Sequence, residues 1–360
     1  MTKPTDIEKK KVLLDLSVLK HPYCGLGQVA LNYIRTINLT DTDSLPFRFV
    51  LLVPRNYYGC CGDKVDYVPR KRYYKLLPFL YPKVQVWHAI HQLSSFRPYS
   101  RQTKYLLTVH DLNFMYEKSD KVARQYKSRV QKRIDRADRI CCISNFTKSE
   151  LYRYMNVPKD TPVSVIYNGV EFADANAAEC CPRLIDPAQP FFFSIGEMKE
   201  KKNFMSIVKM MRYMPDRQLY LAGNDRTDYA NLIRKYISQN GMNNVRLLGF
   251  VSNEERVWLY RHCEAFLFPS LFEGFGLPVI EAMSHGKPVF SSMQTSLSEI
   301  AGEYAFAFDN FEPELMARTV SDNLPLMSEQ RRLREMEYAH TFTYTKHFNQ
   351  YIEIYKSLCN

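Results

Sequence analysis

The sequence lacks the cysteine spacings that would indicate a disulfide framework or a cysteine-rich zinc site. Its 360 residues include nine cysteines, and no two of them form a Cys-x-x-Cys pair. An odd number of cysteines in a chain of this length does not fit a disulfide framework. His88 and His91 in "WHAIHQ" leave zinc as an alternative, but no cysteine or carboxylate at ligand spacing completes such a site. We therefore expect reduced thiols and no bound metal.

A long apolar segment is also missing. No apolar run approaches the roughly 20 residues that a membrane-spanning helix needs. The opening "MTKPTDIEKKKVLLDLSVL" has acids in its polar part and an aspartate inside its short apolar part, which makes it a poor signal peptide. We see no internal repeat and no low-complexity tract. These features predict a cytoplasmic protein.

Length and charge distribution indicate two parts with different partners. A chain of 360 residues is long for one hydrophobic core, so we expect two domains. Residues 1–180 carry 29 Lys and Arg against 17 Asp and Glu, whereas residues 181–360 carry 20 against 21. The net charge of +11 therefore belongs to the first half, which we expect to face something anionic.

Short apolar runs alternate with helical patterns along the chain. Unbroken apolar strands of this length, alternating with helices, indicate parallel sheets covered on both faces. The polar, proline-containing segment 171–190 separates two series of such runs. The fold class is therefore predicted as α/β, with two doubly wound Rossmann-like domains facing a central cleft. The expected domains are residues 1–186 and 187–345, and residues 346–360 are expected to form a helix that returns to the first domain. The strand-like runs are "KVLLDL", "FRFVLLV", "KYLLTV", "RICCIS", "VSVIY", "FFFSIG", "QLYLAG", "VRLLGF", "AFLFPS" and "KPVFSS".

The stretch "SLFEGFGLPVIEAMSHGKP" places two carboxylates, Glu273 and Glu281, around a glycine-containing turn. Glycines at 274 and 276 let the backbone approach a ligand, and Pro278 suits the first turn of a helix whose N-terminus favours a phosphate. One acid for each of two sugars, with a diphosphate between them, describes a nucleotide-sugar. The alternative is an ordinary strand–turn–helix in which a glutamate complements the helix dipole.

Taken whole, "FPSLFEGFGLPVIEAMSHGKPV" resembles the E-x7-E signature of the retaining glycosyltransferases of family four, which have the GT-B fold. Further motifs follow in the order of that family over nearly the full chain. They are "CGLGQVALNYIRTI", "TVHDLNF", "ADRICCISNFTKSEL", "VIYNGV", "SIGEMKEKKNF", "LYLAGN", "VRLLGFVSNEE" and the closing "FTYTKHFNQYIEIYKSL". The resemblance implies an acceptor-side first domain and a second domain that binds the nucleotide-sugar. It implies a metal-independent reaction with no cofactor.

The resemblance also implies roles for the residues of the quoted stretch. Glu281 would bind the nucleotide ribose, and Glu273 would hold the donor sugar as one of the catalytic groups. The backbone residues implied to hold the donor sugar and its diphosphate are Gly274, Phe275, Gly276 and Leu277.

Two lysines are the expected cations of the diphosphate site. In "GEMKEKKN" the family commonly has an arginine where this chain has Glu197, whereas Lys202 matches the family's lysine. We therefore expect Lys202, helped by Lys201, to neutralise the diphosphate. A fixed cation there would lower the barrier because the leaving diphosphate gains charge in the transition state. In isolation the "KEKK" run would read as a solvated face at a helix start.

His110 follows the predicted strand "KYLLTV". A histidine at a strand end is commonly a satisfied structural group. By its resemblance to the family's "HD" motif, however, His110 is expected near the donor sugar, where it could hydrogen-bond the sugar or polarise the reacting centre.

The motif "GLGQVA" formally fits the G-x-G-x-x-A dinucleotide fingerprint through Gly25, Gly27 and Ala30. It begins about eight residues after the predicted strand instead of at the tight turn that the fingerprint requires. In the resembled family the corresponding loop lies near the donor phosphates, and Gly25 and Gly27 are therefore expected to contact the donor.

Two basic stretches explain the charge of the first half. The helical pattern over 121–139 has an apolar stripe and a cationic face, which also suits a plain sheet-covering helix. The stretch "RKRYYKLLPFLYPK" mixes cations with Tyr, Leu and Phe, as in a loop lying on an anionic membrane surface, with a plain surface loop as the alternative. Nucleic acid is a lesser option because no recognition module accompanies these stretches.

The predicted function is transfer of a hexose, first choice mannose from GDP-mannose, to a hydroxyl of a lipid-linked glycan in cell-surface polysaccharide synthesis. A UDP-hexose donor is the next alternative. A non-catalytic glycosyltransferase-like subunit and an NAD-dependent oxidoreductase using "GLGQVA" are the others. The acceptor and the basic first half suggest a peripheral position on the inner face of the membrane.

Overall fold

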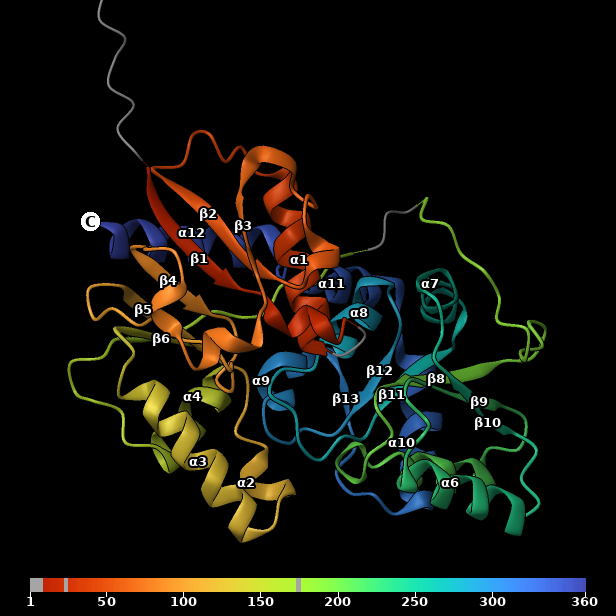
Figure 1. The fold of residues 1–360 in the computed structure, drawn as a ribbon. Coiled ribbons are helices and arrows are strands. Elements are labelled where there is room, and N and C mark those ends of the chain that lie inside the picture. Colours follow the sequence, from red (N-terminus) through yellow and green to blue (C-terminus); the bar gives the residue numbers. More distant parts are fainter. Residues whose placement is uncertain (1–8, 23–24, 173–175) are drawn as a thin grey trace, which may run out of the picture. The chain divides into compact units, whose positions relative to one another are not determined.

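The computed structural model describes residues 9–22, 25–172 and 176–360 (Figure 1). The chain forms two compact α/β units. The N-terminal unit consists of Met1–Gly169 and Tyr344–Asn360, and the C-terminal unit of Val170–Thr343. Each unit is built around one parallel sheet.

The N-terminal unit has a seven-stranded sheet with the order β3-β2-β1-β4-β5-β6-β7. Every paired neighbour runs parallel, so each connection has to cross over a face of the sheet. The strands are β1 (Lys10–Asp15), β2 (Phe47–Val53), β3 (Asp66–Pro69), β4 (Val86–Ala89), β5 (Lys104–Val109), β6 (Arg139–Cys142) and β7 (Val163–Val165). The α-helices are α1 (Gly25–Leu39), α2 (Phe114–Glu117), α3 (Asp120–Ile134), α4 (Asn145–Tyr154) and α12 (Tyr344–Cys359). Single 3-10 turns, η1 to η5, occupy Ser17–Lys20, Arg55–Tyr57, Gly62–Lys64, Arg72–Lys75 and Pro78–Leu80.

Both faces of this sheet are buried. Along β1, Val12 and Leu14 belong to a core with α1 and α12, while Leu13 belongs to a second core with α3 and α4. Alternate side chains of a strand point to opposite faces, so a strand covered on both sides has to be apolar at every position. This covering of both faces explains the unbroken apolar runs in the sequence.

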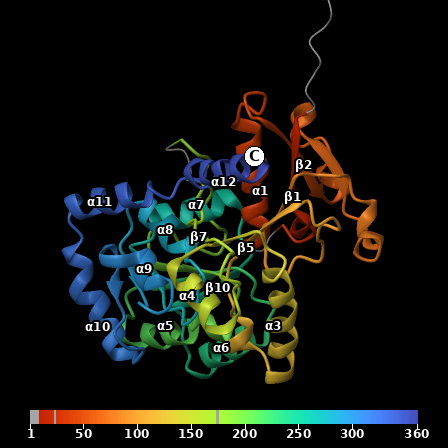
Figure 2. The same ribbon diagram turned by 90° about the vertical axis from the view of Figure 1, so that its left-hand side faces the viewer.

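The C-terminal helix α12 is part of the N-terminal unit. It packs beside α1 on the same face of the sheet (Figure 2), and Phe348, Tyr351 and Tyr355 are fully buried there. His88 on β4 connects the helix to the sheet: its Nδ1 lies 2.7 Å from the Tyr355 hydroxyl and its Nε2 lies 2.8 Å from the Thr108 hydroxyl. The Thr108 hydroxyl is also 2.8 Å from that of Tyr351. This buried network satisfies polar groups that would otherwise be costly in an apolar core.

The C-terminal unit has a six-stranded parallel sheet with the order β10-β9-β8-β11-β12-β13. Its strands are β8 (Phe191–Ile195), β9 (Gln218–Ala222), β10 (Val245–Gly249), β11 (Ala265–Phe268), β12 (Val289–Ser291) and β13 (Phe306–Ala307). The α-helices are α5 (Phe204–Met210), α6 (Asp228–Gln239), α7 (Asn253–His262), α8 (Leu277–Ser284), α9 (Leu297–Ala301), α10 (Pro313–Asn323) and α11 (Glu329–Ala339). The 3-10 turns η6 to η9 occupy Glu200–Lys202, Met211–Tyr213, Gly302–Tyr304 and Leu324–Leu326.

Aromatic residues fill one face of the second sheet. Phe193 contacts Tyr260 of α7 with 5.1 Å between ring centroids, and Phe191 stacks on Trp258 of the same helix at 5.7 Å. The opposite face carries α5, α6 and α10. The expected α/β class with two doubly wound sheets is confirmed.

The division between the units falls between Gly169 and Val170, whereas the sequence had suggested 186 and 187. The chain returns to the N-terminal unit between Thr343 and Tyr344, whereas the sequence had suggested 345 and 346. Part of the intervening segment is bonded to the C-terminal unit. The Cys180 amide donates to the Glu254 carbonyl at 3.2 Å, and Arg261 donates to the Glu179 carboxylate at 3.2 Å. In the part of the chain that the structure describes, no helix is long and apolar enough to cross a membrane.

The network around His88 yields the first prediction. Tyr355→Phe removes the hydroxyl that bonds Nδ1 of the buried imidazole, so the free energy of unfolding should fall by about 1–3 kcal/mol. Urea denaturation followed by tyrosine and tryptophan fluorescence measures this change. Tyr152→Phe, at an exposed position of α4 in the same unit, is the matched control and should change stability by less than about 0.5 kcal/mol. Equal effects of the two substitutions would contradict the role given to this network.

Candidate functional site

Three loops of the C-terminal unit leave the carboxyl ends of adjacent strands. The strand order reverses between β8 and β11, and ligands of doubly wound sheets bind outside the carboxyl ends of the strands at such a point. The loops follow β8, β11 and β12, and they span residues 196–203, 269–276 and 292–296.

An ion pair connects the first two loops. The Lys202 Nζ lies 2.5 Å from Oε1 of Glu273, and only 13% and 14% of the two side chains are exposed. The same ammonium group lies 5.0 Å from the centroid of the Phe268 ring, at the end of β11. Partial burial strengthens the attraction between the charges, because less water screens them. The structure therefore brings two sequence-predicted site residues into direct contact.

Backbone hydrogen bonds hold the two loops together beneath this ion pair. The Lys201 carbonyl accepts from the Leu271 amide at 2.7 Å and from the Ser270 hydroxyl at 3.1 Å. Both contacts fix the backbone next to Lys202, so the lysine extends from a defined position. Lys201 contributes its carbonyl to this arrangement, and its side chain is partly buried.

The loop after β12 supports the loop that carries Glu273. The Thr295 hydroxyl accepts from the Glu273 amide at 3.1 Å, and the buried Ser296 hydroxyl lies 2.9 Å from the Glu273 carbonyl and 3.1 Å from the Phe275 carbonyl. Thr295 adopts a positive φ of 57°, which is uncommon for a residue other than glycine. These two hydroxyl residues were missed from the sequence, although the polar "SSMQTSLSE" directly after a predicted strand was a usable signal.

Gly276 has a backbone conformation that the turn requires. Its φ is 108°, and a Cβ added there would lie 2.6 Å from Cδ2 of Leu297. The residue precedes α8, which begins at Leu277 and has proline in its first turn. Phe275 is buried against Phe342, with ring centroids 5.9 Å apart, whereas Gly274 and Leu277 are partly exposed. The predicted loop residues 274–277 therefore form one tight strand-to-helix connection.

Glu281 lies one turn into α8 and contacts two residues of α7. Its Oε2 accepts from the Tyr260 hydroxyl at 2.9 Å, and its Oε1 lies 3.4 Å from Nη1 of Arg256. The carboxylate raises the pKa of Arg256, and burial together with the same carboxylate raises the pKa of Tyr260 well above its usual value. The two contacts orient the Glu281 carboxylate as a hydrogen-bond acceptor.

Arg256 and Tyr260 were not predicted as site residues. They stand four positions apart in "RVWLY", so they lie on the same face of one helix. That spacing was visible, but nothing local to α7 indicates that this face meets α8.

Glu197, which stands where the resembled family commonly has arginine, does not join the ion pair of Lys202. Its carboxylate lies 2.8 Å from the Lys199 ammonium group, and about half of each side chain is exposed. Such an exposed pair contributes little to stability.

The corresponding edge of the N-terminal sheet contains His110. The strand order reverses between β1 and β4, and His110 follows β5, the next strand along. Its Nε2 lies 2.8 Å from the Ile90 carbonyl, and because a carbonyl only accepts, Nε2 carries the proton in this contact. Burial lowers the pKa of His110 to about 4, so the imidazole is neutral at physiological pH.

Gln92 clamps the backbone on both sides of His110. Its side-chain oxygen accepts from the His110 amide at 3.1 Å, and its side-chain nitrogen donates to the Asp111 carbonyl at 2.6 Å. The Thr147 hydroxyl adds a contact of 3.2 Å to the His110 carbonyl. The ring of His91 lies 6.2 Å from that of His110, and burial lowers the pKa of His91 to about 3.

The two glycines of "GLGQVA" have different surroundings. Gly25 begins α1 with open space where a Cβ would stand, whereas a Cβ at Gly27 would lie 2.4 Å from the His21 carbonyl oxygen and 2.6 Å from that of Pro22. Gly27 therefore permits close approach of two backbone segments. The turn η1 separates the end of β1 from α1, so the tight strand-to-helix turn of a dinucleotide fingerprint is not formed.

The zinc alternative through His88 has no geometric support. Both ring nitrogens of His88 bond hydroxyl groups, as described above. Among the described residues, no three His, Cys, Asp or Glu side chains gather in a way that could hold a metal ion.

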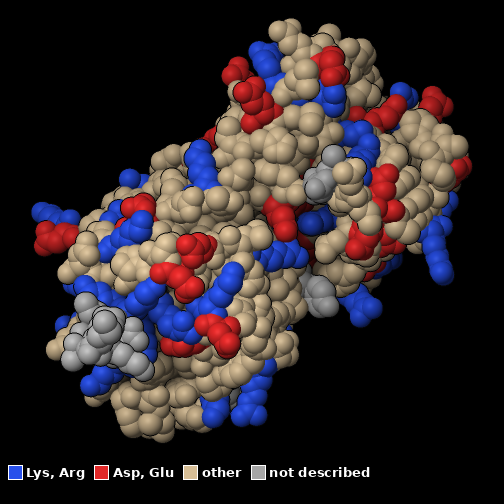
Figure 3. Space-filling view, turned by 90° about the horizontal axis from the view of Figure 1, so that it is seen from above, with Lys and Arg blue, Asp and Glu red and all other residues tan. Residues whose placement is uncertain are grey.

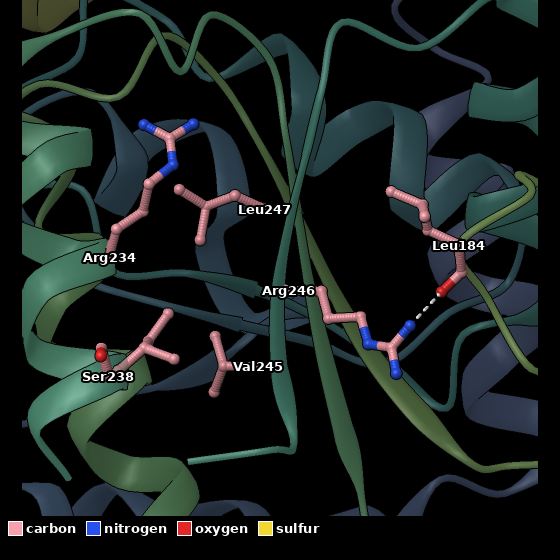
Figure 4. Close-up of a pocket in the computed structure, with 7 residues that line it drawn as sticks. Leu184, Arg234, Ser238, Val245, Arg246 and Leu247 are labelled. Carbon is pink, nitrogen blue, oxygen red and sulfur yellow. Dashed lines mark hydrogen bonds between the residues drawn. The ribbon is translucent and has the colours of Figure 1, made fainter. Parts of the chain in front are cut away.

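A separate open pocket of about 330 Å³ lies beside β10, an edge strand of the second sheet (Figure 4). Val245 and Leu247 face α6 there, while Arg246 points to the other side of the strand and donates to the Leu184 carbonyl at 2.8 Å. None of the sequence-predicted site residues lines this pocket, so it is not the site described above.

Two family models match the chain, one in each half. The model described as "Glycosyltransferase Family 4" matches residues 43–174, and the model described as "Glycosyl transferases group 1" matches residues 182–340. Their matched regions together include every predicted site residue except Gly25 and Gly27.

Two bacterial proteins are similar to the chain over most of its length. "O-antigen chain mannosyltransferase B" of Escherichia coli is 25% identical, with 97% of this chain and 100% of that protein covered. "O-antigen chain mannosyltransferase RfbU" of Salmonella typhimurium is 24% identical, with 78% of this chain and 82% of that protein covered.

Among solved structures, Anabaena Alr3699/HepE in complex with UDP-glucose superposes with a TM-score of 0.72. The sequence identity is 15%, and 96% of this chain and 99% of that chain are covered. At this identity the likeness concerns the fold, and it confirms the expected GT-B class.

The buried histidines of the N-terminal unit predict how its stability depends on pH. Burial lowers the pKa of His91 to about 3, and of His110 and His347 to about 4, against about 6.5 in an unfolded chain. Below pH 6.5 the unfolded chain therefore binds protons that the folded unit does not, and the free energy of unfolding should fall as the pH falls from about 6.5 to 5. Urea denaturation across this interval measures the slope. His91→Asn should make the slope shallower, and stability that rises on acidification would contradict the prediction.

Proposed function

Since this chain belongs to the family 4 glycosyltransferases, we propose that it moves a hexose from a nucleotide-sugar to a hydroxyl of a lipid-linked glycan. Mannose from GDP-mannose is the first choice, with retention of the anomeric configuration and without a metal ion. The glycan belongs to a cell-surface polysaccharide. The observation that carries this proposal is the partly buried contact of Lys202 with Glu273, next to the helix that presents Glu281.

Glu281 is suited to bind the ribose of the donor. A carboxylate has about four lone-pair positions, and Tyr260 and Arg256 occupy two of them. The remaining positions are able to accept hydrogen bonds from two vicinal hydroxyl groups. Because α7 already orients the carboxylate, little rotamer freedom is lost when the ribose binds.

Lys202 is suited to the diphosphate. An ammonium group has three N–H donors, and Glu273 accepts from one of them. The others are able to donate to phosphate oxygens, while the free positions of the Glu273 carboxylate accept from hydroxyl groups of the donor sugar. The first turn of α8, whose Gly276 N-cap provides no side-chain cap, adds backbone N–H groups and the positive end of the helix dipole. The Gly274–Leu277 backbone and Lys201 complete this donor site.

His110 takes the role of a neutral hydrogen-bonding group toward the donor sugar. Its Nε2 is bonded to the Ile90 carbonyl, which leaves Nδ1 as the acceptor. A neutral ring avoids placing a second positive charge where charge develops at the sugar. Gln92 positions His110, and Gly25 and Gly27 contribute the backbone of the loop before α1 and its first turn.

The transfer breaks the bond between C1 of the sugar and the phosphate oxygen, and it forms a bond between C1 and the acceptor oxygen. The acceptor's proton passes to a phosphate oxygen of the leaving diphosphate. Lys202 lowers the barrier because the leaving group is more negative in the transition state than in the bound donor.

The names of the two bacterial relatives support mannose as the sugar, because both are O-antigen mannosyltransferases. A UDP-hexose is the second candidate, and the structural neighbour in complex with UDP-glucose favours it. The two candidates differ in the base and in the stereochemistry of the sugar, and both would place their ribose on Glu281.

We infer the type of acceptor and the cellular position of the enzyme from the distribution of charge along the chain. The excess of cations lies in the first half of the sequence, and Lys121, Arg124, Lys127 and Arg129 are exposed on α3. On the face shown in Figure 3, cationic and anionic side chains lie next to one another, so the excess does not form a continuous basic surface there. We assign the cationic surface of the N-terminal unit to an anionic membrane on the cytoplasmic side, where a lipid-linked acceptor resides, and not to nucleic acid.

The ribose assignment predicts the effect of Glu281→Ala. Loss of charge-assisted hydrogen bonds should weaken nucleotide binding by about 1.5–3 kcal/mol, or roughly tenfold to 150-fold in Kd. Isothermal titration calorimetry with GDP, GDP-mannose and UDP-glucose measures this loss and identifies the base.

Two comparisons separate binding from folding in this experiment. Glu337→Ala removes an exposed carboxylate of α11 and should leave the affinity unchanged. Glu281→Gln keeps the shape of the side chain, and its thermal unfolding should stay close to that of the wild type. Unchanged affinity of a folded Glu281→Ala protein would refute the ribose assignment.

The diphosphate assignment predicts that Lys202→Ala lowers kcat more than it raises the KM for the donor, because the charge of the leaving group is largest in the transition state. Release of GDP during mannose transfer measures both constants. Lys199→Ala, at the exposed pair with Glu197, is the matched control and should have little effect. Addition of EDTA should leave the rate unchanged. Strict dependence on Mg²⁺ or Mn²⁺ would contradict this part of the proposal.

A further inference from the structure

The segment after β3 exposes more apolar surface than any other short stretch of the described chain. Seventeen large hydrophobic residues are exposed in the described ranges, and five of them fall within eight positions. Leu76 is 83% exposed and Phe79 58% exposed. The five are Tyr73, Leu76, Leu77, Phe79 and Leu80.

A sixth exposed aromatic residue extends this surface. Tyr99 is 68% exposed, and its ring lies 6.1 Å from that of Phe79 in an edge-to-face contact. We call these six residues the apolar tip. Soluble proteins rarely expose clustered apolar residues without a partner.

Aromatic contacts connect the apolar tip to the core. Five of its six residues lie in the turns η4 and η5 or between them. Tyr74 of η4 stacks on the buried Tyr81 with 4.2 Å between ring centroids. Tyr81 in turn lies edge-on to Trp87 of β4 at 4.8 Å, so the segment is packed against the core at its base.

The sequence around the apolar tip is strongly basic. From residue 67 to residue 110 the chain contains no Asp or Glu and eight Lys and Arg. The Lys71 ammonium group lies 5.3 Å from the ring centroid of Tyr73, so at least one cation lies directly beside the exposed rings. Apolar and tyrosine side chains in a basic stretch of sequence match the interface of an anionic bilayer, which has negative headgroups above an apolar interior.

We propose that the apolar tip inserts into the interfacial region of an anionic bilayer, while Lys71 beside it contacts the lipid headgroups. This inference rests on the proposed function, because the proposed lipid-linked acceptor is what brings the protein to such a bilayer. It goes beyond the electrostatic attraction assigned above, because it names apolar side chains that leave water. A basic surface without insertion would lose its lipid at high salt, whereas inserted Leu and Phe side chains retain part of the binding.

A tryptophan reporter tests the insertion directly. The two native tryptophans, Trp87 and Trp258, are buried, so their emission provides a constant background. Leu76→Trp should show a blue shift of its emission, and quenching by brominated lipid, when vesicles of phosphatidylcholine and phosphatidylglycerol are added. Leu326→Trp places the reporter at an exposed leucine of the C-terminal unit and should show neither.

Vesicle co-sedimentation tests the contribution of the same side chains to binding. The double variant Leu76→Ser/Leu80→Ser should reduce binding to these vesicles by at least about tenfold, since two apolar side chains no longer enter the bilayer. Leu326→Ser/Leu333→Ser removes two exposed leucines elsewhere and should bind like the wild type. Moderate salt should weaken the wild type, and pure phosphatidylcholine should bind it less.

The outcomes separate this inference from the proposed function. GDP-mannose affinity, measured on the same preparations, should be equal in the wild type and in the double variant. If the wild type binds anionic vesicles while the double variant binds equally well and Leu76→Trp shows no shift, insertion is refuted and the proposed function is unaffected. If the apolar tip instead makes the wild type self-associate without vesicles, and the double variant is monomeric, the partner is a second copy and the inference is also overturned. Absence of donor binding with intact insertion would refute the proposed function alone.

Discussion

Parallel pairing of the strands is the constraint on which the rest of this structure depends. A parallel strand cannot follow its neighbour through a tight turn, so every connection crosses a face of the sheet and usually contains a helix. Both faces are then covered, so the strands are mostly apolar, and buried polar exceptions such as His88 and Thr108 are hydrogen-bonded. All carboxyl ends meet at one edge of each sheet, and the loops that leave this edge can carry polar residues without disturbing the core. His110, Lys202 and Glu273 all lie in or directly after such loops.

The candidate donor site illustrates how a charged site is built on that edge. Glu273 and Glu281 are each placed beside a cation before any ligand binds, Lys202 for the first and Arg256 for the second. A carboxylate that loses water on partial burial is costly unless it is paired. Each pair offsets that cost, and because each acid has acceptor positions left over, the pair does not block it. The hydroxyl groups of Thr295 and Ser296 fix the backbone between the two acids, so the spacing of seven residues becomes a defined distance in space.

The two units of this glycosyltransferase differ in what they expose. The C-terminal unit carries 18 Lys and Arg against 23 Asp and Glu and contains the E-x7-E stretch, while the first half of the sequence carries the cationic excess and the apolar tip. Under the proposed function, a soluble, multiply charged donor and an amphipathic acceptor require different surfaces, one on each unit. The exposed Leu and Phe side chains within a basic stretch fit the second requirement.

The sequence by itself determined the α/β class, ten of the thirteen strands and the loop-and-helix stretch that holds both acids, because apolar runs, glycine turns and the E-x7-E spacing are local signals. Three strands were not predicted from the sequence. One of them is β4, a central strand of only four residues in which His88 is fully buried. Only the tertiary structure decided that α7 supplies Arg256 and Tyr260 to Glu281, and that the division between the units falls at Gly169 and Val170. These features depend on contacts between residues that are distant in the chain, and such contacts are set by how whole helices and sheets pack, which no short stretch of sequence specifies.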